Sequence, residues 1–473
     1  MNCLTIQDIL EATHGEAIGL DPTDLRGVRI HHDSRKVERG SLFWALKGPH
    51  FDGHQFIPEA FDKQASVCVT AQRENLAQGP TIRVEDTQQA LWDLAKWHRQ
   101  RQATMVIGIT GSVGKTTTRE MVYCVLSQNR PGMRSPENYN NDIGLPLSLL
   151  EIQHDHTFAI LELAASACGE IEKLTELCSP SIGVVTGIGP AHLEGFGSFE
   201  NILEAKSELL ASLPDEGLAI VSGDDPHCRS LAAFSPCTVI RVGEEDHNNL
   251  QATDIQIDNR QIQFRCDKSS FLVPACGRHL IPAALTAIAI GRELGMIDDE
   301  IRQGLLSYRP MKGRCQTSIV GNWTVIDDSY NANPSSVEAA CQLLHDWKTN
   351  SRKILVLGDM LELGEHAADY HQDLGSVIAN CDIDEVLYLG QFGENLKTEA
   401  VSSRMLAERI SVFDEIEPLE EALNTKLEPG AVILVKGSRG MKMERVVQWL
   451  ENQSLSNHKE IPTSPPKGNY ETN

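Results

Sequence analysis

The chain has 473 residues, with 42 lysines and arginines against 66 aspartates and glutamates, and its formal net charge is −24 at pH 7. This length is typical of about three domains of ordinary size. A chain this acidic repels the phosphates of nucleic acids, so we expect no nucleic-acid partner, and any acidic ligand must be met by local groups.

The sequence shows no signal for export or membrane insertion. Its start, MNCLTIQDILEATHG, lacks a basic segment and a long apolar stretch, and no later stretch approaches about eighteen consecutive apolar residues. The 12 cysteines contain no C-x-x-C pair, so neither a zinc site nor a disulfide framework is predicted. We expect a cytoplasmic protein with reduced thiols and no membrane insertion. A monomer is the working expectation, although no motif addresses oligomeric state.

Residues 1–101 are predicted to form a first, small α/β unit. Short apolar strands at 41–46 and 66–70 alternate with polar turns and a helix at 57–64. Ser34 and Arg35 share one turn with Asp33. The arginine fork matches phosphate geometry, so these residues suit a diphosphate or sugar, and an exposed ion pair is an equally good interpretation.

A helix at 90–101 is predicted to lead into a second unit, residues 102–311, which opens with a phosphate-binding loop. An apolar strand at 105–109 enters GITGSVGKTTTRE, a glycine-broken turn followed by a helix start. Its backbone N–H groups, a lysine charge and a hydroxyl suit phosphates and magnesium, so a nucleoside triphosphate is predicted. The plain alternative is a glycine-rich turn, since Gly108 lies one residue too far from Gly114 for the usual spacing. The predicted loop residues are Thr110, Gly111, Ser112, Val113, Gly114, Lys115, Thr116 and Thr117.

Three further side chains follow predicted strands of this unit. Glu162 ends the strand at 157–163, His192 follows the strand at 182–188, and Lys206 lies in the next helix. Ligands of parallel sheets gather at the carboxyl ends of the strands, so we expect Glu162 and His192 near the phosphate loop, where they could hold a divalent metal. Each alone would more often be structural. The charge pattern around Lys206 indicates only a solvated helix face.

Residues 312–453 are predicted to form a third, doubly wound α/β unit without a second phosphate loop. The turn DDSYNANP precedes a helix at Ser335, and Lys436 and Ser438 follow a strand end where an anion could bind. The stretch 454–473 is rich in Ser, Pro and Asn, so we expect a disordered tail there. The predicted fold class is therefore α/β with three domains: a small α/β N-terminal domain, a central P-loop ATPase with a mostly parallel sheet, and a C-terminal Rossmann-like domain.

The motifs, taken together, resemble those of the Mur ligase family. The resemblance runs from Asp33 to Glu444. It rests on DSRKVERGSLFWALKG, DGHQFIPEA, GITGSVGKTTTRE, NYNNDIGLPLSLL, ELAAS, GPAHLEGFGS, EAKSELL, MKGR, DDSYNANPSS, GDMLELGEH and VKGSRGMKME. The unusual glycine spacing of the phosphate loop is what this resemblance expects. DDSYNANP and GDMLELG favour the branch that adds D-alanyl-D-alanine to UDP-N-acetylmuramoyl-tripeptide.

The resemblance implies an ATP-dependent amide ligase that works through an acyl phosphate, releases ADP and phosphate, and supplies the pentapeptide precursor of peptidoglycan. Its cofactors would be ATP and Mg²⁺. The N-terminal domain would bind the UDP-sugar, the central domain would bind ATP, and the C-terminal domain would complete the ligase site. Thr116 and Glu162 would hold one magnesium and His192 a second, assisted by a carbamate formed from CO₂ on Lys206. The implied catalytic residues are Lys115, Lys206, His192 and Arg314. The implied ATP-binding residues outside the phosphate loop are His279, Arg314, Asp328 and Tyr330. The implied substrate-binding residues are Ser34, Arg35, Asn140, Asn141, Asn331, Lys436 and Ser438.

The sequence departs from the family pattern at two places. ELAAS has Ala164 where glycine is usual, and Leu280 and Ala283 stand where relatives commonly carry asparagines, one of them near the adenine. The nearest alternative is the sister ligase that adds a diamino acid, but its Asp-Asn-Pro-Arg run is missing here. Folylpolyglutamate synthase is a more distant alternative, and the DSR and DGH motifs of the first unit argue against it. A non-ligating P-loop protein would leave Lys206, His192 and the polar turn of the third unit without a role. No motif indicates whether the third peptide residue is diaminopimelate or lysine.

Overall fold

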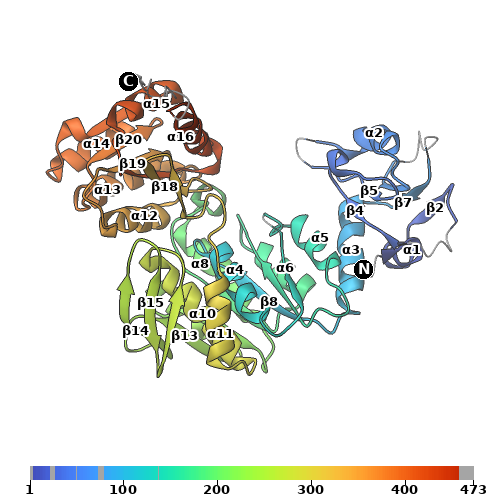
Figure 1. The fold of residues 1–473 in the computed structure, drawn as a ribbon. Coiled ribbons are helices and arrows are strands. Elements are labelled where there is room, and N and C mark those ends of the chain that lie inside the picture. The colour runs from blue at the N-terminus through green and yellow to red at the C-terminus, as the bar shows by residue number, and fades with distance from the viewer. Residues whose placement is uncertain (1–3, 22–26, 49–50, 73–78, 137, 458–473) are drawn as a thin grey trace, which may run out of the picture.

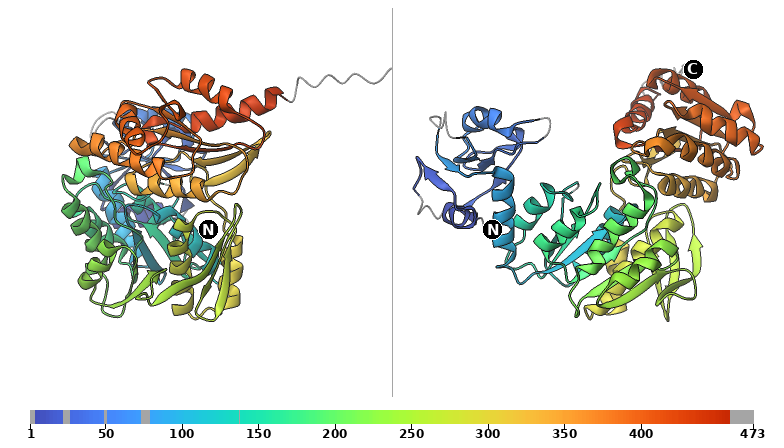
Figure 2. Two further views of the ribbon diagram at one scale, coloured as in Figure 1. Left: turned by 90° about the vertical axis from the view of Figure 1, so that its left-hand side faces the viewer. Right: turned by 180° about the vertical axis from the view of Figure 1, so that it is seen from behind.

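The computed structural model describes residues 4–21, 27–48, 51–72, 79–136 and 138–457. The chain forms three lobes in sequence order, and the N-terminal and C-terminal lobes stand at opposite ends of the central one (Figure 1). The view from behind in Figure 2 gives the same arrangement. Each lobe combines helices with a mainly parallel sheet, so the predicted three-domain α/β fold class is confirmed.

The N-terminal lobe is built on a five-stranded sheet of order β2-β7-β6-β5-β4. A separate pair of short strands, β1 and β3, packs beside it. The elements are β1 (Leu4–Thr5), α1 (Ile6–Thr13), β2 (Glu16–Ile18), β3 (Gly27–Val28), β4 (Ile30–His31), η1 (Ser34–Lys36), β5 (Leu42–Trp44), η2 (Gly53–Phe56), α2 (Ile57–Asp62), β6 (Val67–Thr70), β7 (Thr81–Arg83) and α3 (Thr87–Arg99).

Helix α3 joins the first two lobes. Asp86 caps its first turn by accepting hydrogen bonds from two backbone N–H groups. Leu91 and Leu94 on this helix belong to the core of the N-terminal lobe, whereas Ala95 packs into the core of the central lobe. One helix therefore contributes to both cores, as a rigid connection.

The central lobe contains a nine-stranded sheet of order β16-β15-β14-β13-β12-β11-β8-β10-β9. Pairing is parallel from β9 to β14 and antiparallel between β14, β15 and β16. Its strands are β8 (Met105–Thr110), β9 (Gly132–Arg134), β10 (Phe158–Glu162), β11 (Ile182–Val185), β12 (Leu218–Ser222), β13 (Thr238–Gly243), β14 (Leu250–Ile257), β15 (Ile262–Cys266) and β16 (Ser269–Val273). In register, Glu162 lies opposite Ile109 and Val185 opposite Thr110, so three strands end at one level.

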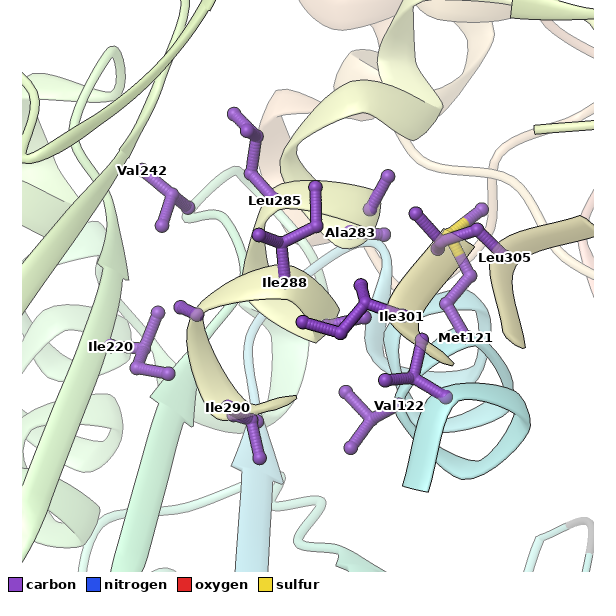
Figure 3. Close-up of a cluster of buried hydrophobic side chains, with 14 of the residues drawn as sticks. Met121, Val122, Ile220, Val242, Ala283, Leu285, Ile288, Ile290, Ile301 and Leu305 are labelled. Carbon is purple, nitrogen blue, oxygen red and sulfur yellow. The ribbon is translucent and has the colours of Figure 1, made fainter. Parts of the chain in front are cut away.

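Helix α10 (Ile281–Glu293) lies at the centre of one of the lobe's cores. Its residues are apolar on every side, which is typical of a fully buried helix. Figure 3 shows Ile288 of α10 among Met121 and Val122 of α4 and Ile301 of α11. The other helices of the lobe are α4 (Lys115–Leu126), α5 (Gly144–Leu150), α6 (Glu170–Cys178), α7 (Leu193–Phe196), α8 (Phe199–Ala211), α9 (Pro226–Leu231), η3 (Ala232–Phe234), η4 (Arg278–Leu280) and α11 (Asp298–Ser307).

The C-terminal lobe has a six-stranded sheet of order β17-β18-β22-β19-β20-β21, parallel except for β17. It contains β17 (Gln316–Val320), β18 (Trp323–Asp328), α12 (Pro334–Asp346), β19 (Lys353–Gly358), η5 (Gly364–His366), α13 (Ala367–Ala379), β20 (Glu385–Leu389), α14 (Gly393–Ser402), η6 (Ala407–Arg409), β21 (Ile410–Phe413), α15 (Ile416–Lys426), β22 (Val432–Lys436), η7 (Arg439–Met441) and α16 (Glu444–Asn457). This is the predicted doubly wound arrangement.

The start predicted for the disordered tail, Ser454, is wrong. Helix α16 continues to Asn457, and Ser454 is buried at 9 % exposure. The helix continues because Val446, Val447 and Leu450 anchor its apolar face in the core of the lobe. The remainder of the predicted tail, 458–473, lies outside the described residues. Among the helices that are described, none is long and apolar enough to cross a membrane, and the described cysteines are free thiols.

Candidate active site

A cavity of about 780 Å³ lies between the central and C-terminal lobes, at the carboxyl ends of β8, β10 and β11. Parallel sheets bind ligands at this position. Most of the residues predicted from the sequence line this single cavity. They are Ser112, Val113, Gly114, Lys115, Thr116, Thr117, Asn140, Glu162, His192, His279, Arg314, Asp328, Tyr330, Asn331, Lys436 and Ser438.

The phosphate loop turns sharply between β8 and α4. Gly111 and Gly114 have φ angles of +144° and +83°, which side chains larger than glycine rarely adopt. Lys115 then begins α4, so the first N–H groups of this helix face the cavity without partners in the helix. Thr110 and Gly111 do not line the cavity, and the Thr110 hydroxyl instead donates to Leu163 O at 2.7 Å.

The side chain of Lys115 turns back over the loop, and its Nζ donates to Gly111 O at 2.6 Å. Removal from water lowers the pKa of Lys115 to about 8. This value includes two smaller effects: the carboxylate of Glu162 raises the pKa of Lys115, and the charge of Arg314 lowers it. The loop therefore holds a lysine whose charge is only weakly compensated, and an anionic ligand would stabilise it.

Glu162 ends β10 and is 4 % exposed. Its Oε1 is buried and has no hydrogen-bond partner. Arg119 Nη1 lies 2.9 Å from this oxygen, so the two groups form an ion pair, although the N–H bonds do not point at it. Sequence reasoning missed Arg119, because an arginine in an amphipathic helix usually indicates an exposed face.

The residues at this position fit a magnesium ion. Carboxylate and hydroxyl oxygens are the ligands that Mg²⁺ prefers, and Glu162 Oε1 is a buried acceptor without a hydrogen bond. The Thr116 side chain is 8 % exposed and lies at the same wall of the cavity. Unsatisfied buried oxygens are rare in folded proteins, so this atom is a reasonable metal ligand.

His192 follows β11, and its Nδ1 is in hydrogen-bond contact with Oε2 of Glu362 in the C-terminal lobe. Both residues have positive φ angles, +56° and +63°, in the left-handed region that favours glycine. The backbone of Glu194 also donates to Glu362 O at 3.2 Å. Glu362 lines the cavity and was not predicted from the sequence as a site residue. It lies there because the turn containing GDMLELG packs against the turn containing His192.

Lys206 is buried at 3 % exposure in α8, so the solvated helix face indicated by the charge pattern is wrong. Its Nζ lies 5.5 Å from the centroid of the Phe196 ring. Burial lowers the pKa of Lys206 to about 7, and the nearby charge of Lys115 lowers it further. Lys206 is not among the cavity-lining residues, but with a pKa of about 7 a substantial fraction of its amine is neutral near pH 7.

Arg314 extends from the segment that joins the two lobes to the phosphate loop. Its Nη2 donates to Thr116 Oγ1 at 3.2 Å, and its guanidinium lies 4.1 Å from the centroid of the Tyr330 ring. The Tyr330 hydroxyl donates to Asn138 Oδ1 of the central lobe. These contacts bring the C-terminal lobe onto the phosphate loop.

Three predicted binding residues of the C-terminal lobe already have internal partners. Lys436 is 2 % exposed, and its Nζ donates to Asp328 Oδ2 at 2.6 Å and to Asn331 O at 2.9 Å. Asp328 Oδ1 accepts from Cys315 N at 3.1 Å. Ser438 Oγ accepts from Leu361 N at 2.8 Å and donates to Ala332 O at 3.3 Å. Lys436 and Ser438 are therefore placed to support the cavity wall.

Three other predicted substrate residues lie outside this cavity. Arg35 forms an exposed two-pronged ion pair with Asp33, and these hydrogen bonds hold the pKa of Asp33 at about 2. Ser34 is buried in the N-terminal lobe and donates to Glu59 at 3.2 Å. Asn141 Oδ1 accepts from the N–H groups of Ile143 and Gly144, so it stabilises the turn that leads into α5.

The positions that depart from the family pattern form an apolar wall. Leu280 and Ala283 are 4 % and 6 % exposed and line the cavity where α10 begins. His279 lies next to them, with its Nε2 3.6 Å from Cys315 Sγ. Removal from water lowers the pKa of His279, so its neutral form is favoured.

The fold and the cavity define a three-domain α/β protein of the P-loop class, with a site completed by its C-terminal lobe. Three family descriptions match: Mur ligase family, catalytic domain, at residues 28–99; Mur ligase middle domain, at 109–291; and Mur ligase, glutamate ligase domain, at 313–439. The chain belongs to the Mur ligase family.

Relatives match along nearly the whole chain. The UDP-N-acetylmuramoyl-tripeptide–D-alanyl-D-alanine ligase of Bacillus subtilis is 35 % identical over 461 residues, which cover 96 % of this chain and 99 % of the relative. The crystal structure of MurF from Acinetobacter baumannii is 31 % identical with a TM-score of 0.86, covering 95 % and 98 % of the two chains. MurF ligase from Thermotoga maritima in complex with ADP is 28 % identical with a TM-score of 0.79, covering 91 % and 98 %.

Proposed function

We propose that this protein is the ligase that joins D-alanyl-D-alanine to UDP-N-acetylmuramoyl-tripeptide with ATP, giving the pentapeptide precursor of peptidoglycan. One observation carries the proposal: groups from different parts of the chain line one cavity. The central lobe contributes the phosphate loop, Glu162 and His192. The joining segment contributes Arg314, and the C-terminal lobe contributes Glu362. Relatives with this named activity match 90 % or more of the chain. The reaction would take place in the cytoplasm, where its nucleotide substrates occur.

The nucleotide would bind with its phosphates on the N-terminus of α4. The free N–H groups of this helix and the charge of Lys115 would hold the β- and γ-phosphates. The base would lie against the apolar wall of Leu280 and Ala283, and His279 would contact its edge. An apolar wall binds the face of a purine by burying apolar surface and makes no hydrogen bonds to it. The selectivity for one base over another would therefore be modest.

Thr116 and Glu162 would hold one magnesium ion and His192 a second. When bound, these ions neutralise negative charge on the phosphates and polarise the γ-phosphoryl group. The chain's own groups do the rest of the positioning. Lys115 and Arg314 place two positive charges beside Thr116, where the leaving ADP would develop negative charge.

Lys206 would carry a carbamate. Its pKa of about 7 leaves a neutral amine that can attack CO₂, forming an N–C bond and releasing one proton. The product is a carboxylate on a buried side chain, and Phe196 beside it excludes water from one side. This carboxylate would supply the oxygen ligand that a lysine itself cannot provide.

The dipeptide would bind at the C-terminal-lobe side of the cavity. D-alanyl-D-alanine is a zwitterion whose two charged ends are about 7 Å apart when extended. Arg439 offers a guanidinium with a side chain 63 % exposed, and Glu362 offers a carboxylate with a side chain 59 % exposed. Leu361 lines the same cavity, where its N–H donates to Ser438 and its side chain packs against Gly440, and it could contact a methyl group. Arg439 would receive the carboxylate and Glu362 the ammonium, next to His192.

The chemistry would proceed in two steps. The tripeptide carboxylate attacks the γ-phosphorus of ATP, which releases ADP and leaves an acyl phosphate. The ammonium of the dipeptide would first lose a proton to the Glu362 carboxylate beside it. The neutral amine would then attack the acyl carbon, and the tetrahedral intermediate would lose a second amine proton and expel phosphate to form the amide. Contacts of Arg314 and Tyr330 with the central lobe would keep water from the acyl phosphate, which would otherwise hydrolyse.

Phosphate release with ATP, Mg²⁺ and UDP-N-acetylmuramoyl-tripeptide tests the proposal. We expect turnover with D-alanyl-D-alanine and none when diaminopimelate or lysine replaces it. Turnover with a diamino acid and the dipeptide precursor would indicate the sister ligase instead. ATP binding without phosphate release in the presence of any acceptor would indicate a non-ligating P-loop protein. Preparing the tripeptide with diaminopimelate and with lysine would also identify the third residue.

A further inference from the structure

Three buried charged side chains, Arg119, Glu120 and Glu162, lie together behind the phosphate loop, and the partly exposed Arg134 joins them. Arg119 is 1 % exposed, and its Nε and Nη2 donate to Glu120 Oε1 at 3.1 and 2.8 Å. Arg134 Nε donates to the same oxygen at 2.7 Å. Two arginines thus share Glu120, and Arg119 also faces Glu162.

The contact between Arg119 and Glu162 is of a different kind. Nη1 and Oε1 are 2.9 Å apart, but the hydrogen bond from Nη1 goes to Pro136 O at 3.4 Å. Glu162 Oε1 has no hydrogen-bond partner. Arg119 therefore compensates the charge of Glu162 and leaves the lone pairs of that oxygen unused. A hydrogen-bonded carboxylate would have to lose its bonds before it could bind a metal, whereas this one would not.

The surroundings of Glu162 carry an excess of positive charge. Arg119 lies beside its carboxylate, and Lys115 is close enough to interact with it and with Arg314. Arg314 in turn donates to Thr116 Oγ1 at 3.2 Å. Around the phosphate loop, the four cations Arg119, Arg134, Lys115 and Arg314 thus outnumber the two carboxylates Glu120 and Glu162. A free divalent cation would be repelled here, while the phosphates of a nucleotide would reverse the local charge.

We propose that Arg119 is a positioning residue that serves as the built-in counterion of Glu162 and keeps divalent metal out of the site until a nucleotide brings it. This inference rests on the proposed nucleotide and magnesium site. Arg119 holds the carboxylate of Glu162 in place while the site is empty of ligand. Metal and nucleotide would consequently enter together, and metal would leave with the product ADP.

Binding of Mn²⁺ without nucleotide, followed by electron paramagnetic resonance, tests this proposal in the full chain. We expect the wild type to bind Mn²⁺ weakly, and Arg119→Met to bind it about tenfold more tightly, because a unit charge a few ångströms from the carboxylate has been removed. Arg134→Met is the matched control. Arg134 is bonded to Glu120 and does not contact Glu162. The Mn²⁺ affinity of this variant should therefore stay within about twofold of the wild type.

A second measurement needs no variant. The wild type should bind ADP in EDTA, because its cationic groups attract phosphate without metal. Tight binding of Mn²⁺ alone to the wild type would overturn the proposal, and so would an unchanged affinity in Arg119→Met. Failure of ADP to bind even with Mg²⁺ would instead contradict the proposed function. The two failures are therefore distinguishable.

Discussion

Lys436 Nζ lies 2.6 Å from Asp328 Oδ2, and the two residues face each other on the neighbouring strands β22 and β18. Both side chains are almost fully buried in the wall of the cavity. The ammonium group also donates to Asn331 O, which fixes the polar turn after β18. A lysine at a strand end is thus bonded here to two groups of its own lobe.

Lys436→Met should lower the free energy of unfolding by about 3–5 kcal/mol, because it leaves the buried Asp328 carboxylate without its partner. Lys63→Met is the control, since Lys63 and Glu59 form a well-exposed pair and its loss should cost less than about 1 kcal/mol. Urea denaturation measures both. Unchanged stability of Lys436→Met, together with a raised KM for the dipeptide, would identify Lys436 as a substrate ligand instead.

Lys206→Ala should reduce phosphate release by at least about a hundredfold, the effect typical of losing one group that stabilises the transition state. Added formate or acetate should restore part of the rate, because a short carboxylate can take the place of the carbamate. Lys173→Ala, at an exposed position on α6, should behave like the wild type. A mutant that keeps full activity would exclude the carbamate.

The stability of the metal-free protein in CO₂-free buffer should rise between pH 7 and pH 10. The folded-state pKa of Lys206 is lowered to about 7, so the unfolded chain binds more protons in this range and is disfavoured as pH rises. The gain is at most about 1.4 kcal/mol per pH unit for this lysine. Urea denaturation of wild type and Lys206→Met measures it. The free energy of unfolding should rise less with pH in Lys206→Met than in the wild type, because the contribution of this lysine is lost. Identical pH profiles of the two proteins would contradict burial of a neutral amine.

Arg439→Gln should lower kcat/KM for D-alanyl-D-alanine about tenfold to a hundredfold, as expected for the loss of a charged hydrogen bond. The same variant should use D-alanyl-D-alaninamide, which lacks the carboxylate, as well as the wild type does. Arg409→Gln, at an exposed position in η6, is the control and should change neither value. Equal losses with both acceptors would show that Arg439 does not receive the carboxylate.

The parts of the site that the sequence predicted depend on local signals. A β-branched strand, glycines at fixed positions and a lysine at a helix start define the phosphate loop wherever it occurs. Glu162 and His192 could be placed because parallel strands end at one level, which the register of β8, β10 and β11 confirms. The three-domain α/β fold followed from the same alternation of strands and helices.

The rest depended on tertiary burial, which no local pattern contains. Lys206 lies in a helix with the charges of a solvated face, but its own side chain is turned inward beside Phe196. Arg119 could not be predicted because its partner Glu162 comes from another element. The helical turn at Ser454 was missed for a related reason, since its apolar anchors precede the polar segment.

His192 and Glu362 each hold a left-handed backbone conformation that costs a residue with a side chain about 1–2 kcal/mol relative to glycine. Selection for thermal stability alone would therefore favour glycine at both positions. Laboratory evolution toward a more stable protein, or a design that optimises fold energy, would remove the side-chain contact of His192 with Glu362, one of several contacts between the two lobes at the site. If both residues serve the proposed reaction, the strain marks a point where stability and activity conflict.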